Sequence, residues 1–520
     1  MKKFRLVLSL ILAFLAVFTL VGCKESTNAS GDFGITLEEI IANAKKLSYS
    51  DQGQGQQQVT GTPNFNVPEG GYDGSTVTIK FYHTMGKNLI TVLDKYVKKF
   101  NEIYPNITVE HKQIGNYDGV RDQISTELPA GNEPNIAYCY PDHVALYNLT
   151  GKVVQLDNLI NSTIADDARN GGQIGLTAAQ KADFIKGYYE EGSQFGDGLM
   201  YTMPFSKSTE VLYYNETFFT ANNIPVPTHW FNESEDDTTS LEAVCKKIKE
   251  LKPDCIPLGY DSEANWFITM AEQCGADYTS ATGDHYLFSN PTMKTLMAKF
   301  REWYQLGYIT TQKLYGSYTS GLFVADENDE KTTNSYMSIG SSAGATHQRP
   351  EKVTVTNEDG TETSVYPFVV GIASIPQMST TYQRVISQGP SVCIFNKANP
   401  QEVVASWLFV KFLTTSTLFQ AEFSSVSGYV PVLHSVAQNA QYAANIAKAD
   451  GTTNIAYLSA KVCLEQADFY YTSPAFNGSS VARDQVGALL TTILSKEADN
   501  AVKMINDAFQ DAIDECEYQG

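Results

Sequence analysis

The sequence predicts a two-lobed α/β protein, and two observations carry this prediction. The chain has 520 residues, too many for one small hydrophobic core, so two lobes are expected. Strand-like and helix-like patterns alternate between residues 76 and 140, which is typical of a parallel sheet covered by helices. Hydrophobic residues make up 42% of the chain and aromatic residues 12%, enough for packed cores.

The first lobe opens with three strands and two helices that the hydrophobic periodicity predicts. The strands are expected at Thr76–Tyr82, Ile107–Gln113 and Asn135–Tyr140. The helices between them are expected from Lys87 to Ile103 and from Gly119 to Leu128. Ligands of parallel sheets bind beyond the carboxyl ends of the strands, so a site is expected there.

A crossover between the lobes is predicted at Met203–Asn215, near the middle of the chain. A strand-like run at Glu210–Tyr214 follows a small polar turn at 206–208, and foldable apolar sequence lies on both sides. We expect this stretch to form one wall of a ligand cleft, with Lys207 either a charge in the cleft or a solvated side chain. A second crossover, returning to the first lobe, is expected at about 371–389.

Five further elements follow from local patterns in the rest of the chain. Apolar periodicity predicts helices at Leu241–Leu251, Pro400–Thr414, Ala482–Ile493 and Asp499–Glu515. The run Val353–Tyr366 predicts a surface hairpin that turns at an Asp-Gly pair.

The charge of the chain limits its partners. With 58 acidic and 37 basic residues the formal net charge is −21, which disfavours binding to nucleic acid or to an anionic membrane surface. An acidic, solvated surface explains this charge best.

The N-terminus resembles the signal of a bacterial lipoprotein. Lys2, Lys3 and Arg5 precede an apolar run, Leu6–Val21, which is about as long as a secretory segment and short for a membrane span. The run ends in Leu-Val-Gly-Cys, which resembles a lipobox and implies cleavage before Cys23 and lipid on its thiol. The alternatives are an ordinary secretory signal and a single membrane anchor.

We therefore expect residues 1–22 to be a lipoprotein signal peptide and residues 23–74 a flexible tether. The tether region is rich in Ser, Gly, Gln, Asn and Thr, and one short helical pattern at 37–46 interrupts it. The folded body would then sit at the cell surface, anchored to the outer face of the cytoplasmic membrane.

The cysteines indicate no metal site. The seven that remain besides Cys23 form no CxxC pair, and no histidine lies at zinc-ligand spacing, so no metal and no cofactor are expected. Cys245 and Cys255 could form a local disulfide, whereas Cys139 and Cys393 lie in apolar runs that favour buried thiols.

Several segments, in this order, resemble the extracellular solute-binding proteins of ABC importers, in the carbohydrate-binding group. These are VTIKFYHTMG, KKFNEIYPNITVE, AGNEPNIAY, LYYNETFF, VPTHW, GIASIPQ, WLFVKFLTT and GYVPV. The resemblance implies a periplasmic-binding-protein-like fold with an interlobe hinge and a cleft that closes on a solute. Lobe 1 is then expected over 75–205 plus 385–420 and lobe 2 over 206–384 plus 421–520. The expected partners are a small solute and the permease subunits, with the protein itself a monomer.

Within this family the chain resembles the glycerol-3-phosphate-binding branch more finely. The resemblance lies in FYHTMG, GNYD at 115–118, PFSKSTEVLYYN and NGSSVARDQV. It implies that Tyr117 and Asp142 hold glycerol hydroxyls, although Asp142 stands where that branch has Glu. It also implies a set of residues around the phosphate: Ser208, Ser342, Gly389, Tyr429 and Arg483.

Other candidate contacts complete the predicted site. Tyr82 and His83 lie at the end of the first strand, Ser206 in the crossover, and Ser341 in the Gly/Ser turn SIGSSAG, where backbone N–H groups and hydroxyls could bind an anion or a polyol. Trp266 is either a core aromatic residue or a ring that stacks on a sugar, as the family places an aromatic near here.

The predicted chemistry is binding rather than catalysis. A phosphate needs several donors and a charge, and an arginine supplies both through its planar fork, although most arginines form surface ion pairs. No HExxH or P-loop pattern occurs, so a secreted enzyme such as a glycoside hydrolase is the lesser alternative. A receptor for neutral mono- or oligosaccharides with the same fold is the nearer alternative, and a purely adhesive lipoprotein is disfavoured by the ordered α/β pattern.

Overall fold

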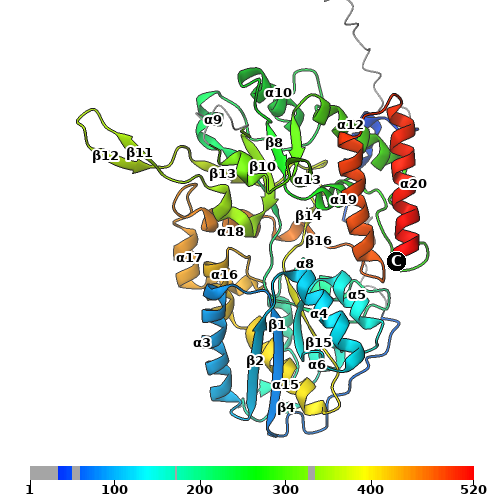
Figure 1. The fold of residues 1–520 in the computed structure, drawn as a ribbon. Coiled ribbons are helices and arrows are strands. Elements are labelled where there is room, and N and C mark those ends of the chain that lie inside the picture. The colour runs from blue at the N-terminus through cyan, green and yellow to red at the C-terminus, as the bar shows by residue number, and fades with distance from the viewer. Residues whose placement is uncertain (1–32, 50–58, 170–171, 326–333) are drawn as a thin grey trace, which may run out of the picture.

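The computed structural model describes residues 33–49, 59–169, 172–325 and 334–520. Two lobes lie one above the other, each built on a five-stranded sheet with helices against it (Figure 1). The expected two-lobed α/β fold is therefore confirmed. The predicted signal peptide and Cys23 lie outside the described residues.

The sheet of lobe 1 has the strand order β2-β1-β3-β15-β6. β1 pairs in parallel with both β2 and β3, as the alternating pattern predicted, whereas β15 is antiparallel to β3 and to β6. The strands are β1 (Val77–His83), β2 (Ile107–Gln113), β3 (Ile136–Cys139), β6 (Met203–Pro204) and β15 (Ser391–Ile394).

The sheet of lobe 2 has the order β13-β7-β10-β8-β9 and the same kind of arrangement. β8 pairs in parallel with β9 and β10, and β7 is antiparallel to β10 and β13. The strands are β7 (Glu210–Asn215), β8 (Leu258–Tyr260), β9 (Ile309–Thr311), β10 (Met337–Ser341) and β13 (Val370–Ala373).

The chain crosses between the lobes where the sequence predicted. β6 belongs to the first sheet and β7 to the second, so the stretch 205–209 is a crossover. The return runs from β13 to β15 and contains β14 (Val385–Ile386), which pairs in parallel with β16 (Tyr470–Tyr471). In each sheet the antiparallel strand is the one that the chain enters from the other lobe. This strand is β15 in lobe 1 and β7 in lobe 2.

The helices of lobe 1 cover its sheet with apolar faces. α3 buries Val92, Leu93, Tyr96 and Phe100, the stripe expected from its periodicity. The helices are α3 (Lys87–Ile103), α4 (Tyr117–Ala130), α5 (Pro141–Asn148), α6 (Asp157–Ile160), α7 (Ala178–Asp183), α8 (Lys186–Glu190), η2 (Glu191–Ser193), α15 (Pro400–Thr414) and α16 (Thr417–Ser427), with a small ribbon of β4 (Ala165–Asp166) and β5 (Gly172–Gln173).

In lobe 2, α19 packs against α11, α12 and α20, which confirms a helical C-terminal region. The helices are α9 (Glu216–Ala221), α10 (Leu241–Leu251), α11 (Glu263–Cys274), α12 (Pro291–Gln305), α13 (Gln312–Tyr315), α14 (Ser320–Phe323), η3 (Ser342–Gln348), α18 (Ile455–Glu465), α19 (Ser479–Ser495) and α20 (Ala501–Gln519). At the boundary of the lobes lie η4 (His434–Gln438), α17 (Ala440–Ile446) and η5 (Ala467–Phe469), which contact helices α16 and α8 of lobe 1 and α18 of lobe 2.

The expected lobe boundary at residue 421 is wrong, because it cuts through α16. This helix packs against α3 of lobe 1, and its Phe419 and Phe423 contact Phe205, with ring centroids 5.6 and 5.5 Å away. These aromatic contacts keep α16 with lobe 1, and the chain returns to lobe 2 only after it.

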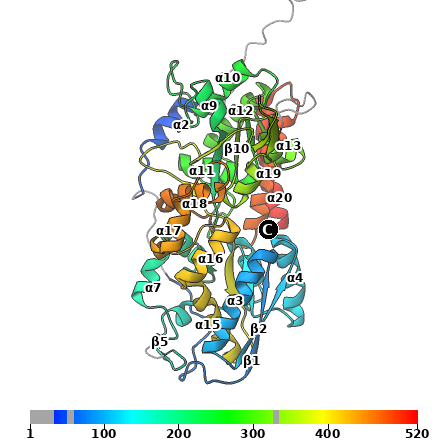
Figure 2. The ribbon, with the colours of Figure 1, turned by 90° about the vertical axis from the view of Figure 1, so that its left-hand side faces the viewer.

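The expectation of a flexible tether over 23–74 is wrong for its described parts. Helix α2 (Leu37–Ala44) begins with a capping box at Thr36, buries Ile40 and packs against α11 and α12 of lobe 2 (Figure 2). Farther on, Phe65 is buried and Asn64 exchanges hydrogen bonds with lobe 1. Polar composition alone did not reveal these anchoring apolar residues.

A two-stranded hairpin projects from lobe 2, as predicted (Figure 1). It consists of β11 (Val353–Thr356) and β12 (Glu362–Val365), whose residues are all exposed, and Gly360 adopts a positive φ of 80° in the turn. Glycine tolerates this left-handed conformation without steric cost.

Among the described residues, no single helix is long and apolar enough to cross a membrane. α15 and α16 together meet the criteria of length and composition, but the two are bent by 68°. The seven described cysteines are all buried free thiols, including the pair Cys245 and Cys255.

Candidate functional site

Four segments of the chain meet at the first crossover. Lys207 exchanges two backbone hydrogen bonds with Val430, of 3.1 and 2.6 Å, and Ser208 exchanges two with Gln388, of 2.9 and 2.8 Å. The next residue, Thr209, exchanges hydrogen bonds with Ser342 at the start of η3. The crossover therefore lies between the returning chain, the segment after α16 and the edge of lobe 2.

A buried ion pair occupies this meeting point. Lys207 and Glu191 have 0% and 2% of their side chains exposed, and Lys207 Nζ donates to Glu191 and, over 3.0 Å, to the carbonyl of Gly389. Glu191 also accepts hydrogen bonds of 2.9–3.1 Å from three hydroxyls, those of Ser387, Ser391 and Thr472. We call these six residues the junction network.

The junction network corrects both expectations for Lys207. Its amino group is neither solvated nor directed at a ligand, because it neutralises a buried carboxylate and ties the two crossovers together. The sequence did not indicate this ion pair, since Glu191 lies 16 positions before Lys207 in a polar segment without a recognisable motif.

Gly389 has a structural reason to be glycine. Its φ is +85°, and a Cβ at this position would lie 2.6 Å from the carbonyl oxygen of Ser206. Any larger residue would push the two crossovers apart. The predicted site residues Ser208 and Gly389 are thus brought together, with Ser206 buried beside them.

Tyrosines from three segments of lobe 1 form the second part of the site. The hydroxyls of Tyr117 and Tyr429 lie 3.1 Å apart, and the rings of Tyr117 and Tyr140 meet edge to face at 4.9 Å. Tyr117 starts α4 directly after β2, and Tyr140 caps α5 directly after β3, so both lie at carboxyl ends of strands, as expected. All three are half-buried, and burial raises the pKa of each, so they stay neutral donors.

Arg483 belongs to lobe 2 and lies on a helix that contacts lobe 1. It is half-buried on α19, a helix that packs against α5 of lobe 1. Its positive charge counteracts the effect of burial on the pKa of Tyr140 in lobe 1 and of Tyr278 in lobe 2, so it lies near side chains of both lobes. Asp142, in the first turn of α5, accepts a hydrogen bond of 3.0 Å from the backbone N–H of His143 and also affects the pKa of Tyr278.

We call Tyr117, Tyr140, Asp142, Tyr429 and Arg483 the interlobe site. It offers neutral hydroxyl donors, one carboxylate and one guanidinium, a set that suits a hydroxylated or anionic solute. Among the described residues no group of three or more His, Cys, Asp or Glu side chains could hold a metal ion.

Sequence reasoning missed the residues that support Arg483. Its guanidinium donates to Asn265 Oδ1, and Asn265 Nδ2 donates to Glu210 Oε1 over 2.9 Å. Glu210 is fully buried in β7 and also accepts a hydrogen bond of 2.6 Å from Tyr260. The sequence did offer one indication of this network, since Glu210 is a charged residue within an otherwise apolar strand.

Four predicted contacts lie in other environments. Trp266 is fully buried, with its ring 4.9 Å from Tyr260 and 4.4 Å from Phe300, so it belongs to the core and has no face for a sugar. Tyr82 is buried against α4, and its hydroxyl donates to Glu127 over 3.4 Å. Ser342 is fully buried and bonded to Thr209, while the hydroxyl of Ser341 caps η3.

His83 is also buried, in a chain of hydrogen bonds that fixes its protonation. Its Nδ1 accepts from the backbone N–H of Met85 over 3.1 Å, so the proton of the neutral ring is on Nε2, which donates to His111 Nδ1 over 3.0 Å. His111 in turn donates to Asp94 over 2.9 Å. Burial, and then the proximity of His111, lowers the pKa of His83 to about 4.

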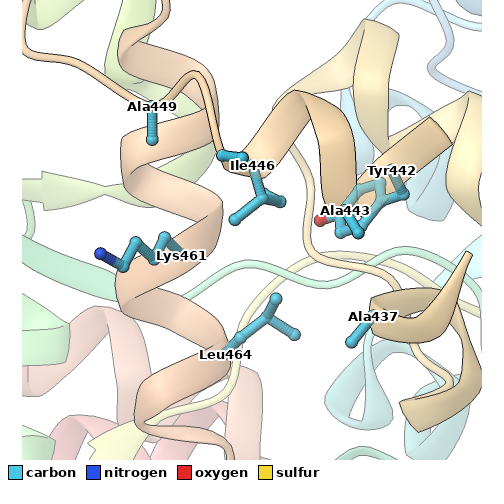
Figure 3. Close-up of a pocket in the computed structure, with 8 residues that line it drawn as sticks. Ala437, Tyr442, Ala443, Ile446, Ala449, Lys461 and Leu464 are labelled. Atoms are coloured by element: carbon cyan, nitrogen blue, oxygen red, sulfur yellow. The ribbon is translucent and has the colours of Figure 1, made fainter. Parts of the chain in front are cut away.

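A pocket of about 360 Å3 lies elsewhere, between η4, α17 and α18 (Figure 3). Its lining is mostly aliphatic, with Ala437, Ala443, Ile446 and Leu464, and the amino group of Lys461 points away from the other labelled side chains. Tyr442 and Lys461 are the polar side chains of this lining, which is otherwise apolar and suits a polyol or an anion less well than the tyrosines and Arg483 do.

The sequence is similar to a family of known binding proteins. Residues 95–450 match the model of a family described as bacterial extracellular solute-binding proteins. The sn-glycerol-3-phosphate-binding periplasmic protein UgpB of Salmonella typhimurium is 25% identical over 175 residues, 33% of this chain and 37% of that protein. UgpB of Escherichia coli K12 is 26% identical over 145 residues, 28% of this chain and 30% of that protein. The chain thus aligns with about a third of the length of these relatives.

Solved structures share the fold over most of the chain. The cyclic alpha-maltosyl-1,6-maltose binding protein of Arthrobacter globiformis superposes with a TM-score of 0.62 at 17% identity, covering 86% of this chain and 100% of its own. UgpB of Mycobacterium tuberculosis in complex with glycerophosphocholine gives 0.59 at 16% identity, with the same coverage. The sugar-binding protein MalE of Xanthomonas citri gives 0.62 at 15%, covering 85% of this chain and 98% of its own.

The junction network generates a prediction about stability. Lys207→Met leaves Glu191 charged and buried without its cation, and we expect the free energy of unfolding in urea to fall by about 3–5 kcal/mol. Lys503→Met, which breaks the exposed pair with Asp507, is the control and should cost no more than about 1 kcal/mol. A loss below about 1 kcal/mol for Lys207→Met would show that the pair does not hold the junction together.

The buried His83 predicts how stability depends on pH. The unfolded chain takes up a proton at this histidine near pH 6.5 but the folded protein only near pH 4, so stability falls as the pH drops through this window. The effect amounts to roughly 3 kcal/mol at most. In His83→Asn, whose side-chain oxygen can still accept from Met85, this part of the pH dependence should disappear, whereas exposed His347→Asn should keep it. Identical urea-unfolding curves for the His83 variant and the wild type between pH 4 and 6.5 would contradict the assignment.

Proposed function

This chain belongs to the bacterial extracellular solute-binding proteins, and from that premise we propose that it captures a glycerol-phosphate-type solute between its lobes. Proteins of this family bind solutes rather than transform them. The proposed ligand is sn-glycerol-3-phosphate or a glycerophosphodiester, taken up for an ABC importer.

One observation carries the choice of ligand. Arg483 is half-buried on α19 of lobe 2, which packs against α5 of lobe 1, and its charge acts on Tyr140 at the start of α5, where Tyr117 and then Tyr429 follow in contact. A guanidinium has five N–H donors, and those that Asn265 does not hold could donate to an anion in charge-assisted hydrogen bonds, which contribute roughly 1.5–3 kcal/mol each. The match to glycerol-3-phosphate-binding relatives supports the same chemistry.

The arrangement also supports capture by hinge closure. The proposed contacts come from both lobes, while two crossovers and the junction network join the lobes at one end of the site. A ligand that binds both lobes would favour the state in which they are close, and the permease could recognise that state.

A neutral sugar is the second candidate, and the tyrosines favour it. Tyr117, Tyr140 and Tyr429 present aromatic surface and hydroxyls, which suit the faces and edges of a sugar ring. Several proteins of similar fold are named for maltose-type ligands, although at these identities the likeness concerns the fold.

Arg483→Ala tests the choice of ligand. We expect the wild type to bind sn-glycerol-3-phosphate in titration calorimetry, and the variant to bind it about 10- to 100-fold more weakly, because it loses charge-assisted hydrogen bonds. Arg349→Ala is the matched control, since this arginine bonds to backbone carbonyls of Thr452 and Thr453 instead. Binding of maltose without any binding of the phosphoester would replace the proposal by the sugar receptor.

We further propose that lipid on Cys23 anchors the protein to the outer face of the cytoplasmic membrane, where it delivers the solute to the permease. The apolar segment and the Leu-Val-Gly-Cys sequence support this anchoring.

Cell fractionation tests the anchor. In a host with lipoprotein processing, the wild type should sediment with the membranes, and Cys23→Ala should lose lipid labelling. Cys139→Ala, a buried thiol within lobe 1, is the control and should keep its label. Lipid labelling of Cys23→Ala equal to that of the wild type would refute the anchor.

A further inference from the structure

We infer that Asn265 is the positioning residue of Arg483, and that Glu210 behind it sets the charge which Arg483 presents to an anionic ligand. This inference rests on the proposed function, because it takes the ligand to be anionic. The residues Tyr260, Glu210, Asn265 and Arg483 are called the arginine relay below.

The arginine relay is a continuous path of hydrogen bonds from the core to the interlobe site. Tyr260 on β8 donates to one oxygen of Glu210 over 2.6 Å, and Asn265 on α11 donates to the other over 2.9 Å. Arg483 on α19 donates to the amide oxygen of Asn265. Tyr260 and Glu210 are fully buried and Asn265 is 2% exposed, while Arg483 is half-buried at the outer end.

Glu210 determines how the amide of Asn265 is turned. A carboxylate accepts hydrogen bonds only, so the NH2 group of Asn265 must face Glu210 and its oxygen must face the guanidinium. That oxygen holds one N–H of Arg483. A guanidinium carries five N–H donors in a fixed plane, so the orientation set by this bond also directs the remaining donors.

The charge of the relay depends on Glu210. Burial raises the pKa of Glu210 to about 7, while its hydrogen bonds from Tyr260 and Asn265 and the charge of Arg483 act in the opposite direction. Above this pH the carboxylate offsets the charge of Arg483, and below it the relay carries a full positive charge. Affinity for an anion should therefore be greater on the acidic side.

Other titratable groups face the relay from neighbouring elements. Asp261 follows β8, Tyr471 lies on β16, and Asp484 is the residue after Arg483 on α19. Tyr140 faces Arg483 from lobe 1. The effect of Glu210 must therefore be isolated by comparing two proteins at the same pH rather than by one titration curve.

Glu210→Gln makes this comparison possible, because it mimics the protonated state. The glutamine oxygen can accept from Asn265, and its NH2 group can donate to the hydroxyl oxygen of Tyr260, so the relay stays bonded without its negative charge. The matched control is Glu263→Gln on the same helix as Asn265. Glu263 is another buried carboxylate, 4% exposed, that accepts from the backbone of Lys313 over 2.8 Å.

The experiment measures the dissociation constant for sn-glycerol-3-phosphate by calorimetry between pH 5.5 and 8.5. The ratio of the constants of variant and wild type at each pH removes the titration of the phosphate itself. We expect Glu210→Gln to bind roughly fivefold to tenfold more tightly than the wild type at pH 8.5, from the loss of one negative charge near the ligand, and equally tightly at pH 5.5. Glu263→Gln should follow the wild type throughout.

Asn265→Ala tests the positioning role separately. Arg483 then loses its partner, and the affinity at pH 7 should fall about tenfold, as expected for the loss of a charge-assisted hydrogen bond that orients the guanidinium. Thermal unfolding without ligand shows whether each variant is folded. Should Asn265→Ala fail to fold, the pH comparison with Glu210→Gln still decides the inference.

The results separate this inference from the proposed function. A wild type that binds the phosphoester, together with a Glu210→Gln variant of equal affinity at every pH, overturns the inference and leaves the proposed function intact. Unchanged affinity in folded Asn265→Ala also overturns it. A wild type that binds maltose but no phosphoester overturns both.

Discussion

The structure depends on one buried interaction, the ion pair between Lys207 and Glu191. It lies where the chain passes between the lobes, and the hydroxyls of Ser387, Ser391 and Thr472 complete the coordination of the carboxylate. Removing charges from water costs several kcal/mol, which only a nearly complete set of partners can offset. The pair therefore holds four segments together where the chain passes between the lobes.

The interlobe site draws its residues from both of the lobes that these segments join. Tyr117 and Tyr140 follow the parallel strands of lobe 1, and Arg483 approaches from a helix of lobe 2. The crossovers join the lobes, and under the proposed function a solute would bridge the side chains that the two lobes contribute. Binding of a solute to both lobes would thus also bring the lobes together.

Much of this architecture follows from sequence periodicity. The bounds of α3, β2, α10 and α15 agree with their predicted ranges, and the crossover at Met203–Asn215 was expected from a polar turn before a strand. Periodicity reports which face of an element is apolar, so it finds elements well. It also led to the expectation of a site beyond the carboxyl ends of the parallel strands, where Tyr117 and Tyr140 lie.

The polar interior could not be predicted in the same way. Lys207 pairs with Glu191, and Asn265 links Glu210 to Arg483, which lies 218 positions after Asn265. No local sequence pattern connects these residues. For Trp266 the sequence left both a core position and a sugar contact open, because a tryptophan suits either, and only the packed rings around it decide for the core. The anchoring of α2 likewise depends on a few apolar residues in polar surroundings.

A crystal structure of the protein with sn-glycerol-3-phosphate tests the central claim most directly. The account predicts the phosphate at the interlobe site, with oxygens about 3 Å from Arg483 and its glycerol hydroxyls toward the tyrosines of lobe 1. A phosphate bound elsewhere, with Arg483 still bonded only within the protein, would contradict it.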